Sequence, residues 1–400
     1  MRIAVVCGHF LPELGYIEVH LVRSFVQAGH AVGVFTSTVM PSYIGKATHE
    51  HFSATTEQTD GYQITRIRPY FNLGQMVRAK GLVEKVIKFQ PELVVIIGIG
   101  KLFPTPLLKK KHLKHKTIVV LGDNSDNKKI YGDSSKRRLL GFLNKMKTSA
   151  IQKLLKNKAY RLTVQNADQL FAYTPETPEV VSGFIPNKMH ALLRKKIKFI
   201  SLGFDDRLYY FDEREREKKR KELQLSQDEL VLVTATRVTA NKRLERVISC
   251  MKSVKGFKYI LIGFMQNDYE VALKKLIRDY GLGERILCYP FLPHEEVRKL
   301  YNAADIGIWH HPTISTIEGM GTGLTVLLEK RKKASHLLPD DKYGRFFIED
   351  ELSKILKDVC DNFRNSPNQR KDIAYGNKVK LSWHAISKQI LDERVNFSHP

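Results

Sequence analysis

The stretch 305-DIGIWHHPTISTIEGMGTGLTVLL-328 decides the fold of this chain. It predicts a short buried strand, a loop with Ser and Thr, a short helix that carries Glu318, and a second apolar strand. A helix N-terminus presents unpaired N–H groups and a partial positive charge, which favour phosphate. We expect Glu318 to accept hydrogen bonds from hydroxyl groups nearby. The pattern therefore predicts a site for a ligand with a diphosphate and several hydroxyls, such as a nucleotide sugar.

Apolar segments alternate with helical segments along most of the chain. In the N-terminal half, the sequence predicts strands at 3–7, 31–37, 61–68, 91–100 and 116–123, helices at 17–30 and 76–89, and a continuation of the pattern over 162–174. In the C-terminal half, it predicts strands at 229–237, 258–264, 284–292, 304–310 and 324–330. Continuous apolar runs separated by helices indicate parallel sheets covered on both faces. The predicted class is α/β, with two Rossmann-like doubly wound units.

The alternation pauses near residue 200. The segment 199–225, FISLGFDDRLYYFDEREREKKRKELQL, is polar and weakly periodic, which is typical of a linker. Four hundred residues also exceed one ordinary core. We expect one domain over 1–200 and a second over 201–381, facing each other across a cleft. The segment 382–395 predicts an amphipathic helix after the second sheet.

Composition excludes several classes of protein. The chain is 42% hydrophobic and 27% charged, as in a globular protein. The sequence contains no run of about 18 apolar residues, so it predicts no membrane span. Its apolar start resembles a β-strand more than a signal peptide. The cysteines form no CxxC pair, which favours a reducing cytoplasm and no zinc site. They are Cys7, Cys250, Cys288 and Cys360.

The net charge of +24 is concentrated in the N-terminal half. Residues 1–200 hold 31 Lys and Arg against 13 Asp and Glu, or +18, and residues 101–200 alone give 22 − 6 = +16. One side of the molecule should carry a positive field that attracts an anionic membrane, an acidic polymer or nucleic acid. Basic residues of 107–161 surround an apolar helical stripe, which fits either a surface helix or one that binds anionic lipid.

Two cations follow the first strand of the C-terminal half. Arg237 comes after the strand 229–237, and Lys242 lies five residues later, near the next helix start. Both are placed to reach one diphosphate from the carboxyl end of the sheet. Two solvated surface charges are the alternative.

The short helix that begins near Ser315 and Thr316 carries three glycines beside Glu318. Gly319, Gly321 and Gly323 are poor helix formers, so the sequence predicts close backbone approach there. We expect Gly319 to help bind the ligand. The alternative for Glu318 is an acid that only complements the helix dipole.

Further candidates lie in the N-terminal half. Gly15, in the loop 9-HFLPELGYIEVH-20, is placed to admit a phosphate or sugar close to the backbone. Asp123 and Asp126 follow a predicted strand and fit either acids that face the acceptor or a turn and helix cap. The adjacent His310 and His311 lack a partner at metal-ligand spacing, so no metal site is expected.

These motifs, in this order, resemble the family 4 glycosyltransferases of the GT-B fold over nearly the whole chain. The loop 9–20 is similar to the family's glycine-rich first loop, and Arg237 and Lys242 match its R-x4-K pair, which implies diphosphate binding. Further matches are Gly203, Asp205 and Phe211 in an interdomain segment, Gly263 at a strand end, and Trp383 in a closing helix. The resemblance implies that this helix, 382–400, packs back on the first domain.

The family's E-x7-E motif fits in two registers. One takes Glu318 and Glu329 as the two acids, with a spacing three residues too long. The other aligns 317-IEGMGTGLTVLL-328 without an insertion, makes Glu318 the acid expected to bind the ribose, and places His310 at the first acid. We prefer the second register. The family's N-domain histidine is not evident.

The resemblance implies a retaining glycosyltransferase that moves a sugar from a nucleotide sugar to a glycan or lipid-linked glycan, in cell-surface polysaccharide or glycoconjugate synthesis. It implies catalytic roles for Arg237, Lys242 and Glu318, and donor contacts at Gly15, Gly263, His310, Ser315, Thr316 and Gly319. No cofactor or metal is expected, and the protein should be cytoplasmic, at most peripheral on the inner face of the cell membrane. Alternatives are a catalytically reduced scaffold or partner subunit, a sugar-nucleotide epimerase, and a nucleic-acid-binding protein, for which no recognition module is evident.

Overall fold

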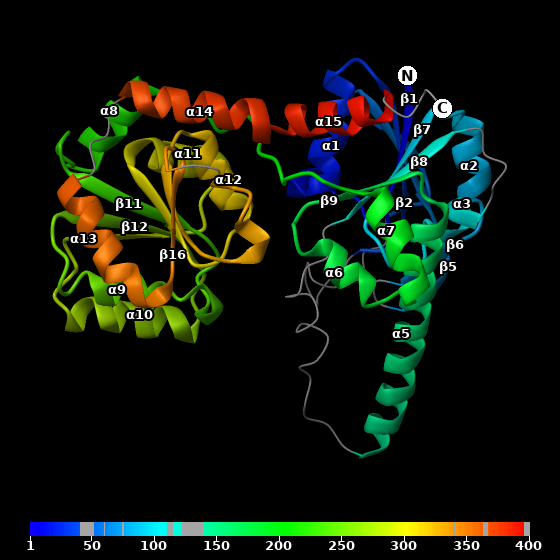
Figure 1. The fold of residues 1–400 in the computed structure, drawn as a ribbon, viewed down its shortest axis with the longest axis horizontal. Helices are drawn as coiled ribbons and strands as arrows, with labels where there is room; N and C mark the ends of the chain where they lie inside the picture. Colours follow the sequence, from blue (N-terminus) through cyan, green and yellow to red (C-terminus); the bar gives the residue numbers. More distant parts are fainter. Residues whose placement is uncertain are drawn as a thin grey trace. The chain divides into compact units, whose positions relative to one another are not determined.

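The computed structural model describes residues 1–40, 52–59, 61–73, 76–109, 115–121, 139–338, 341–362 and 367–395. The chain divides into two compact units (Figure 1). Unit 1 comprises Met1–Ser201 and Ser387–Pro400, and unit 2 comprises Leu202–Ile386.

Unit 1 contains a largely parallel sheet with the strand order β10-β9-β8-β7-β1-β2-β4-β3. Only the edge strand β3 runs antiparallel to its neighbour among the described strands of this sheet. The strands are β1 Arg2–Val6, β2 Ala31–Ser37, β3 Thr56–Thr59, β4 Tyr62–Ile67, β7 Leu93–Ile97, β8 Lys116–Leu121, β9 Gln169–Ala172 and β10 Ile197–Phe199. This arrangement is Rossmann-like, as the alternation of apolar segments predicts.

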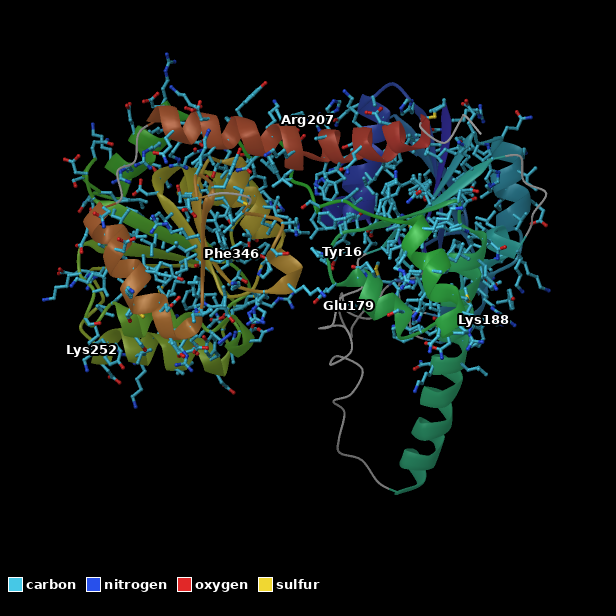
Figure 2. All side chains as sticks on the ribbon, in the orientation of Figure 1. Tyr16, Glu179, Lys188, Arg207, Lys252 and Phe346 are labelled. Carbon is cyan, nitrogen blue, oxygen red and sulfur yellow. The ribbon has the colours of Figure 1, made fainter. Side chains whose placement is uncertain are left out.

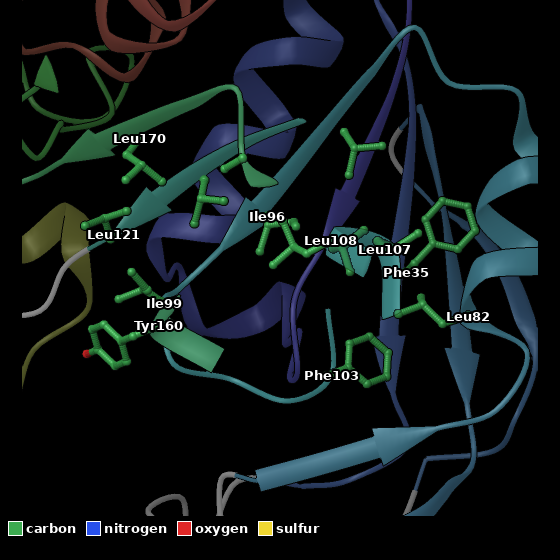
Figure 3. Close-up of a cluster of buried hydrophobic side chains, with 14 of the residues drawn as sticks. Phe35, Leu82, Ile96, Ile99, Phe103, Leu107, Leu108, Leu121, Tyr160 and Leu170 are labelled. Carbon is green, nitrogen blue, oxygen red and sulfur yellow. The ribbon is translucent and has the colours of Figure 1, made fainter. Parts of the chain in front are cut away.

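Helices cover both faces of this sheet. Helix α1 (Ile17–Gln27) packs on one face, and the other face is covered by α2 (Leu82–Phe89), α3 (Thr105–Lys109), α5 (Leu139–Asn166), α6 (Thr177–Ser182) and α7 (His190–Lys196). Figure 3 shows this second layer, where strand side chains such as Phe35, Ile96 and Leu121 meet Leu107 and Tyr160. All five side chains are at most 3% exposed, so their burial provides the main stabilisation of unit 1.

One predicted segment of unit 1 is wrong in part. The helix expected over 76–89 is a strand, β6 (Met76–Ala79), paired with β5 (Pro69–Leu73), and α2 begins only at Leu82. Gly81, with a φ of 83°, separates them, because a left-handed residue interrupts a continuous helix. The segment 162–174 starts as the last turn of α5, before β9.

Unit 2 contains a six-stranded sheet with the order β13-β12-β11-β14-β15-β16. Every pairing between its strands is parallel. The strands are β11 Leu230–Ala235, β12 Phe257–Phe264, β13 Ile286–Pro290, β14 Ile306–Trp309, β15 Thr325–Glu329 and β16 Gly344–Phe347. The five strands predicted from the sequence match the first five, and β16 has no counterpart in the prediction.

Side chains of the unit 2 strands alternate between two cores. One core faces α9 (Leu244–Cys250), α10 (Asp268–Asp279) and α13 (Leu352–Asn362). The other faces α11 (His294–Ala303), α12 (Ile314–Gly321) and α14 (Pro367–Leu381). Unit 2 is therefore a second doubly wound α/β unit, with helices on both faces of its sheet.

The predicted linker is largely wrong. Residues Glu213–Glu222 form α8, which packs on α11. Its inward side chains are Arg216 and Arg220, which are 9% and 0% exposed and contact the carboxylate of Asp305. The helix has no apolar stripe, because arginines that pair with a buried acid take the place of hydrophobic residues.

The chain enters unit 2 beside the first residues of α15 (Trp383–Val395), whose later residues belong to unit 1. The backbone of Phe204 bonds to Leu381 and Trp383 at 3.0 and 2.9 Å. Gly203 is required there, since a Cβ at this position would lie 2.7 Å from the Trp383 ring. The glycine and tryptophan of the sequence motif thus fix the start and the end of unit 2 to each other.

No helix in the described part of the chain is both long and apolar enough to cross a membrane.

Candidate active site

The sheet of unit 2 has a topological switch between β11 and β14. The chain proceeds from β11 to β12 and β13 on one side, and from β14 to β15 and β16 on the other. Loops after two such strands leave the sheet in opposite directions, and open α/β sheets bind ligands at this point. Arg237 follows β11 and His310 follows β14, so the structure places these two candidates on either side of the switch.

The loop after β11 is held against the end of β12. Thr236 N donates to Ile262 O at 3.0 Å, and Val238 N donates to Gly263 O at 3.2 Å. Gly263 has a φ of 115°, and a Cβ there would lie 2.0 Å from Thr236 O. This glycine therefore allows the loop to close on β12, and its expected contact with the donor stays a prediction. Arg237, in the same loop, is exposed.

Lys242 and Arg243 have different surroundings. Lys242 is half-buried and ends the short helix Ala240–Lys242. Arg243 donates to both carboxylate oxygens of Glu329, at 2.7 and 2.8 Å, and also pairs with Glu349. Arg331 donates to the same Glu329 at 2.8 Å. Glu329, the second acid of the less favoured register, thus already forms ion pairs with two arginines.

Helix α12 begins at Ile314, with Thr313 as its N-cap. Thr316 is fully buried, and its hydroxyl accepts a hydrogen bond from Thr313 N at 3.1 Å. Its role is therefore to cap the helix. Ser315 is half-buried, and its carbonyl accepts a hydrogen bond from the Tyr301 hydroxyl at 2.9 Å.

The three glycines of α12 and its C-terminus approach protein atoms closely. A Cβ would lie 3.0 Å from the Trp309 ring at Gly319, 2.4 Å from the Phe204 ring at Gly321, and 2.3 Å from Arg370 O at Gly323. The predicted close approach is present, and protein side chains and backbone lie where a Cβ would point at each of these glycines. Packing within unit 2 explains all three glycines.

Glu318 lies in the second turn of α12 and is 9% exposed. Burial raises the pKa of its carboxyl to about 7, and a hydrogen bond from Tyr209 partly opposes this rise. The Tyr209 hydroxyl also lies 2.5 Å from Nδ1 of His294. The sequence analysis missed both residues. Tyr209 lies within the segment 199–225, between the matched residues Asp205 and Phe211, but no spacing connects it to α12 or to the start of α11.

His310 follows β14, and its side chain is turned into the protein. It is 2% exposed, and its ring meets Phe347 edge to face at 5.3 Å. Burial, together with the nearby Arg243, lowers the pKa of the imidazole to about 4, so the ring is neutral at pH 7. Its Nε2 has no hydrogen-bond partner among the described residues. The carbonyl of His310 accepts from Arg331 at 3.0 Å.

In unit 1, Gly15 has a φ of 56° and ends the short helix Pro12–Leu14, directly before Tyr16 (Figure 2). Tyr16 is the N-cap of α1, and Glu18 lies in the first turn of that helix. Burial raises the pKa of Glu18 to about 7. An acid that is partly neutral at pH 7 repels a nearby anion less than an ionised one would.

Several predicted sites lie outside the described residues or only partly within them. Asp123 and Asp126 lie outside the described residues. Of the basic region 107–161, the structure describes 107–109, 115–121 and 139–161, with side chains of the helix only from 152 onward. Within the described ranges of the chain, no three His, Cys, Asp or Glu side chains are grouped so that they could hold a metal ion.

The structure therefore brings Arg237, Lys242, Gly263 and His310 to the carboxyl edge of one sheet, with Glu318 in the helix that starts there. Gly15 belongs to unit 1.

Part of the chain is similar to a known protein family. Residues 215–379 match the family model described as glycosyl transferases group 1. They cover most of unit 2, including most of α8, which had been expected to be part of a linker. A comparison with curated protein sequences finds no match.

Solved structures resemble the whole chain. Sucrose-phosphate synthase from Thermosynechococcus elongatus is 15% identical, with a TM-score of 0.65 over 99% of this chain and 98% of that one. HepE from Anabaena, solved with UDP, is 16% identical, with a TM-score of 0.66 over 99% of this chain and 100% of that one. WaaG, a glycosyltransferase involved in lipopolysaccharide biosynthesis, is 14% identical, with a TM-score of 0.56 over 98% and 99%. At these identities the likeness shows the fold, which is GT-B, as expected.

Proposed function

We propose that this chain, whose residues 215–379 match the family model of glycosyl transferases group 1, transfers a sugar from a nucleotide-sugar donor bound by unit 2. The observation that carries the proposal is the position of Arg237 and Lys242 after β11, at the topological switch, with Glu318 in the helix that follows β14. HepE, which shares the fold, was solved with UDP-glucose.

The proposed chemistry follows from the charges at this edge. As the glycosidic bond to the donor breaks, negative charge develops on the leaving diphosphate. Arg237 and Lys242 offset this charge, and the N-terminus of α12 adds its partial positive charge. Glu318 accepts hydrogen bonds from the ribose hydroxyls. Because fixed cations neutralise the diphosphate, we predict that transfer persists when divalent metal is removed with a chelator.

The acceptor is proposed to be a glycan or lipid-linked glycan bound by unit 1. The net charge of +16 over residues 101–200 supports an anionic acceptor or an anionic membrane surface near it. Retention of the anomeric configuration and a role in cell-surface polysaccharide or glycoconjugate synthesis are further parts of this proposal. The anomeric configuration of the first product, measured by NMR before mutarotation, tests retention.

The first experiment identifies the donor. Thermal unfolding is measured with UDP, ADP, GDP, CDP and dTDP, each at a concentration that saturates a typical site. A nucleotide at 100 times its Kd stabilises the protein by about 2.7 kcal/mol, which gives a measurable rise in Tm. If none of the five raises Tm, the proposed function is wrong.

The second experiment places the diphosphate. Calorimetry with the best nucleotide compares the parent with the Arg237→Ala, Lys242→Ala double variant. Loss of a charged hydrogen bond costs about 1.5–3 kcal/mol for each contact, so affinity should fall at least tenfold. The control is Lys252→Ala, an exposed lysine between α9 and β12, at the amino end of the sheet (Figure 2). Equal affinity of parent and double variant would show that the diphosphate binds elsewhere.

A further inference from the structure

A chain of polar groups connects the buried Glu318 to solvent. The Tyr209 hydroxyl, on a side chain that is 2% exposed, forms a hydrogen bond with Glu318. The same hydroxyl lies 2.5 Å from Nδ1 of His294. The His294 side chain is 63% exposed, and its Nδ1 lies 3.9 Å from a carboxylate oxygen of Glu318. Solvent therefore reaches His294 but hardly reaches Glu318.

Three separate segments provide these groups. Tyr209 follows a turn in which its N–H donates to Asp205 O at 2.8 Å. His294 is the first residue of α11, and Glu318 belongs to α12. Tyr301, seven residues after His294, lies on the same face of α11 and packs on Tyr209 with ring centroids 6.3 Å apart. The positions of all three groups are thus fixed by the fold.

The charged groups around Glu318 are few. His294 is the cationic partner of Glu318 among the ion pairs of the described residues. From α11, Tyr301 directs its hydroxyl to Ser315 O, and from the preceding loop Asp205 lies near Tyr209. From α14, Arg370 donates to Thr322 O at 2.8 Å and Asn377 donates to Met320 O at 2.8 Å, so both serve backbone carbonyls of this region.

A tyrosine hydroxyl carries one proton, which it donates to one neighbour at a time. If Tyr209 donates to Glu318, then His294 must supply a proton to the Tyr209 oxygen, and Glu318 is an anion. If Tyr209 donates to His294, its oxygen accepts from a protonated Glu318. Both arrangements form two hydrogen bonds. In the first arrangement Glu318 is an anion, which accepts stronger hydrogen bonds from the hydroxyls of a ligand than the protonated acid of the second.

We propose that His294, acting through Tyr209, is a positioning residue that favours the anionic form of Glu318, the form that accepts the ribose hydroxyls. The proposal rests on the proposed function, in which Glu318 binds the ribose of the donor. It makes donor affinity depend on the protonation state of Glu318.

The acid–base properties of the two buried groups agree with this coupling. With His294 in place, burial raises the pKa of Glu318 to about 7, so this acid is half-protonated at neutral pH. Burial also raises the pKa of Tyr209, with a further rise from Glu318, and the hydroxyl therefore keeps its proton.

The test is a pH series of nucleotide binding, from pH 6 to pH 8.5, by calorimetry with the best nucleoside diphosphate of the panel above. The variants are His294→Ala and Tyr209→Phe. Glu318→Gln, which has no acid at this position, corrects for titration of the nucleotide itself. Glu295→Ala, exposed in the same turn of α11, is the matched control.

In the parent, an acid with a pKa of about 7 is about one-tenth ionised at pH 6 and nine-tenths ionised at pH 8. The corrected affinity of the parent and of Glu295→Ala should therefore fall about tenfold from pH 8 to pH 6, and the affinity of His294→Ala should begin to fall at a higher pH and be lower at neutral pH. Tyr209→Phe should follow His294→Ala. A loss of affinity that is equal at all pH values, or no loss, would overturn the proposal and leave His294 with a structural role at most.

A second measurement needs no nucleotide. The carboxyl carbon of Glu318, followed by NMR in a protein labelled at glutamate, should titrate at higher pH in His294→Ala than in the parent. Equal titration would overturn the inference even if the nucleotide binds. Failure of every nucleotide to bind, with a shifted Glu318 titration, would instead reject the proposed function and retain the coupling.

Discussion

Two acids in unit 2, only thirteen residues apart, are buried in opposite ways. Asp305 is 3% exposed, and its oxygens accept from Arg216 at 2.6 Å, Arg220 at 3.4 Å and Val231 N at 2.8 Å. Glu318 is 9% exposed, and its cationic neighbour is a histidine at 3.9 Å. The negative charge of Asp305 is compensated by hydrogen bonds and ion pairs within the protein. Glu318 has lost contact with water without gaining equivalent partners.

The surroundings of Asp305 explain why it belongs to the scaffold. The carbonyls at the end of α11, which lack helical partners, accept hydrogen bonds from three buried arginines. Arg216 and Arg220 come from α8, and Arg370 comes from α14. Asp305 supplies the negative charge for this group. Burial still lowers the pKa of Arg370 to about 9, with a further contribution from Arg216.

The comparison indicates which of the two buried acids of unit 2 is available to accept hydrogen bonds from a ligand. A buried charge that is fully paired is costly to disrupt, because removing one partner leaves the other buried and uncompensated. A buried acid with weak partners destabilises the free protein, and a ligand that donates hydrogen bonds to it recovers that free energy. Glu318 fits the second description, and Asp305 fits the first.

The largest effect is expected from Asp305→Asn. The substitution leaves Arg216 and Arg220 buried without their carboxylate, and breaking a buried ion pair costs about 3–5 kcal/mol. Urea unfolding of unit 2 should therefore begin at a clearly lower concentration. Asp228→Asn, at an exposed position before β11, makes the same charge change and should have little effect. Similar midpoints for both variants would contradict the scaffold role of Asp305.

A somewhat smaller and pH-dependent effect is expected from Glu318→Gln. Burial raises the pKa of Glu318 from 4.5 to about 7, so the unfolded chain releases this proton at lower pH than the folded protein. The free energy of unfolding of the parent should therefore fall between pH 4.5 and pH 7, by about 3 kcal/mol for this group. Glutamine cannot ionise, so the variant should match the parent near pH 4 and be more stable at pH 8.

Urea midpoints measured across this pH range check the expectation, with the exposed Glu295→Gln as the control. If the urea midpoints of the parent and of Glu318→Gln differ by the same amount at pH 4 and pH 8, burial does not raise the pKa of Glu318.

The contrast also shows what could be predicted from the sequence. Apolar runs identify the parallel strands of both units, because strands buried on two faces need continuous hydrophobic segments. Helix α8 escaped prediction, since Arg216 and Arg220 face inward and only the distant Asp305 makes this favourable. The close approach at Gly321 was predictable, but its partner, Phe204, was not, because contacts between distant segments leave no local pattern.

Site residues divide in the same way. Arg237, Lys242 and Glu318 were predicted from their positions after strands, where the topology of an α/β sheet places ligands. Their roles stay predictions. Tyr209 and His294 were missed, because their relation to Glu318 exists only after α11 and α12 have packed together. His310 was expected to face the ligand, whereas in this structure its ring packs on Phe347.

The most direct test of the central claim is whether Glu318 binds the ribose of a donor. Calorimetry at pH 8 compares the best nucleoside diphosphate with its 2′,3′-dideoxy counterpart, on the parent and on Glu318→Gln. The account predicts that the parent favours the ribose form by about 1.5–3 kcal/mol, roughly tenfold or more in Kd, and that the variant loses most of this preference. An equal preference in both proteins would contradict the claim.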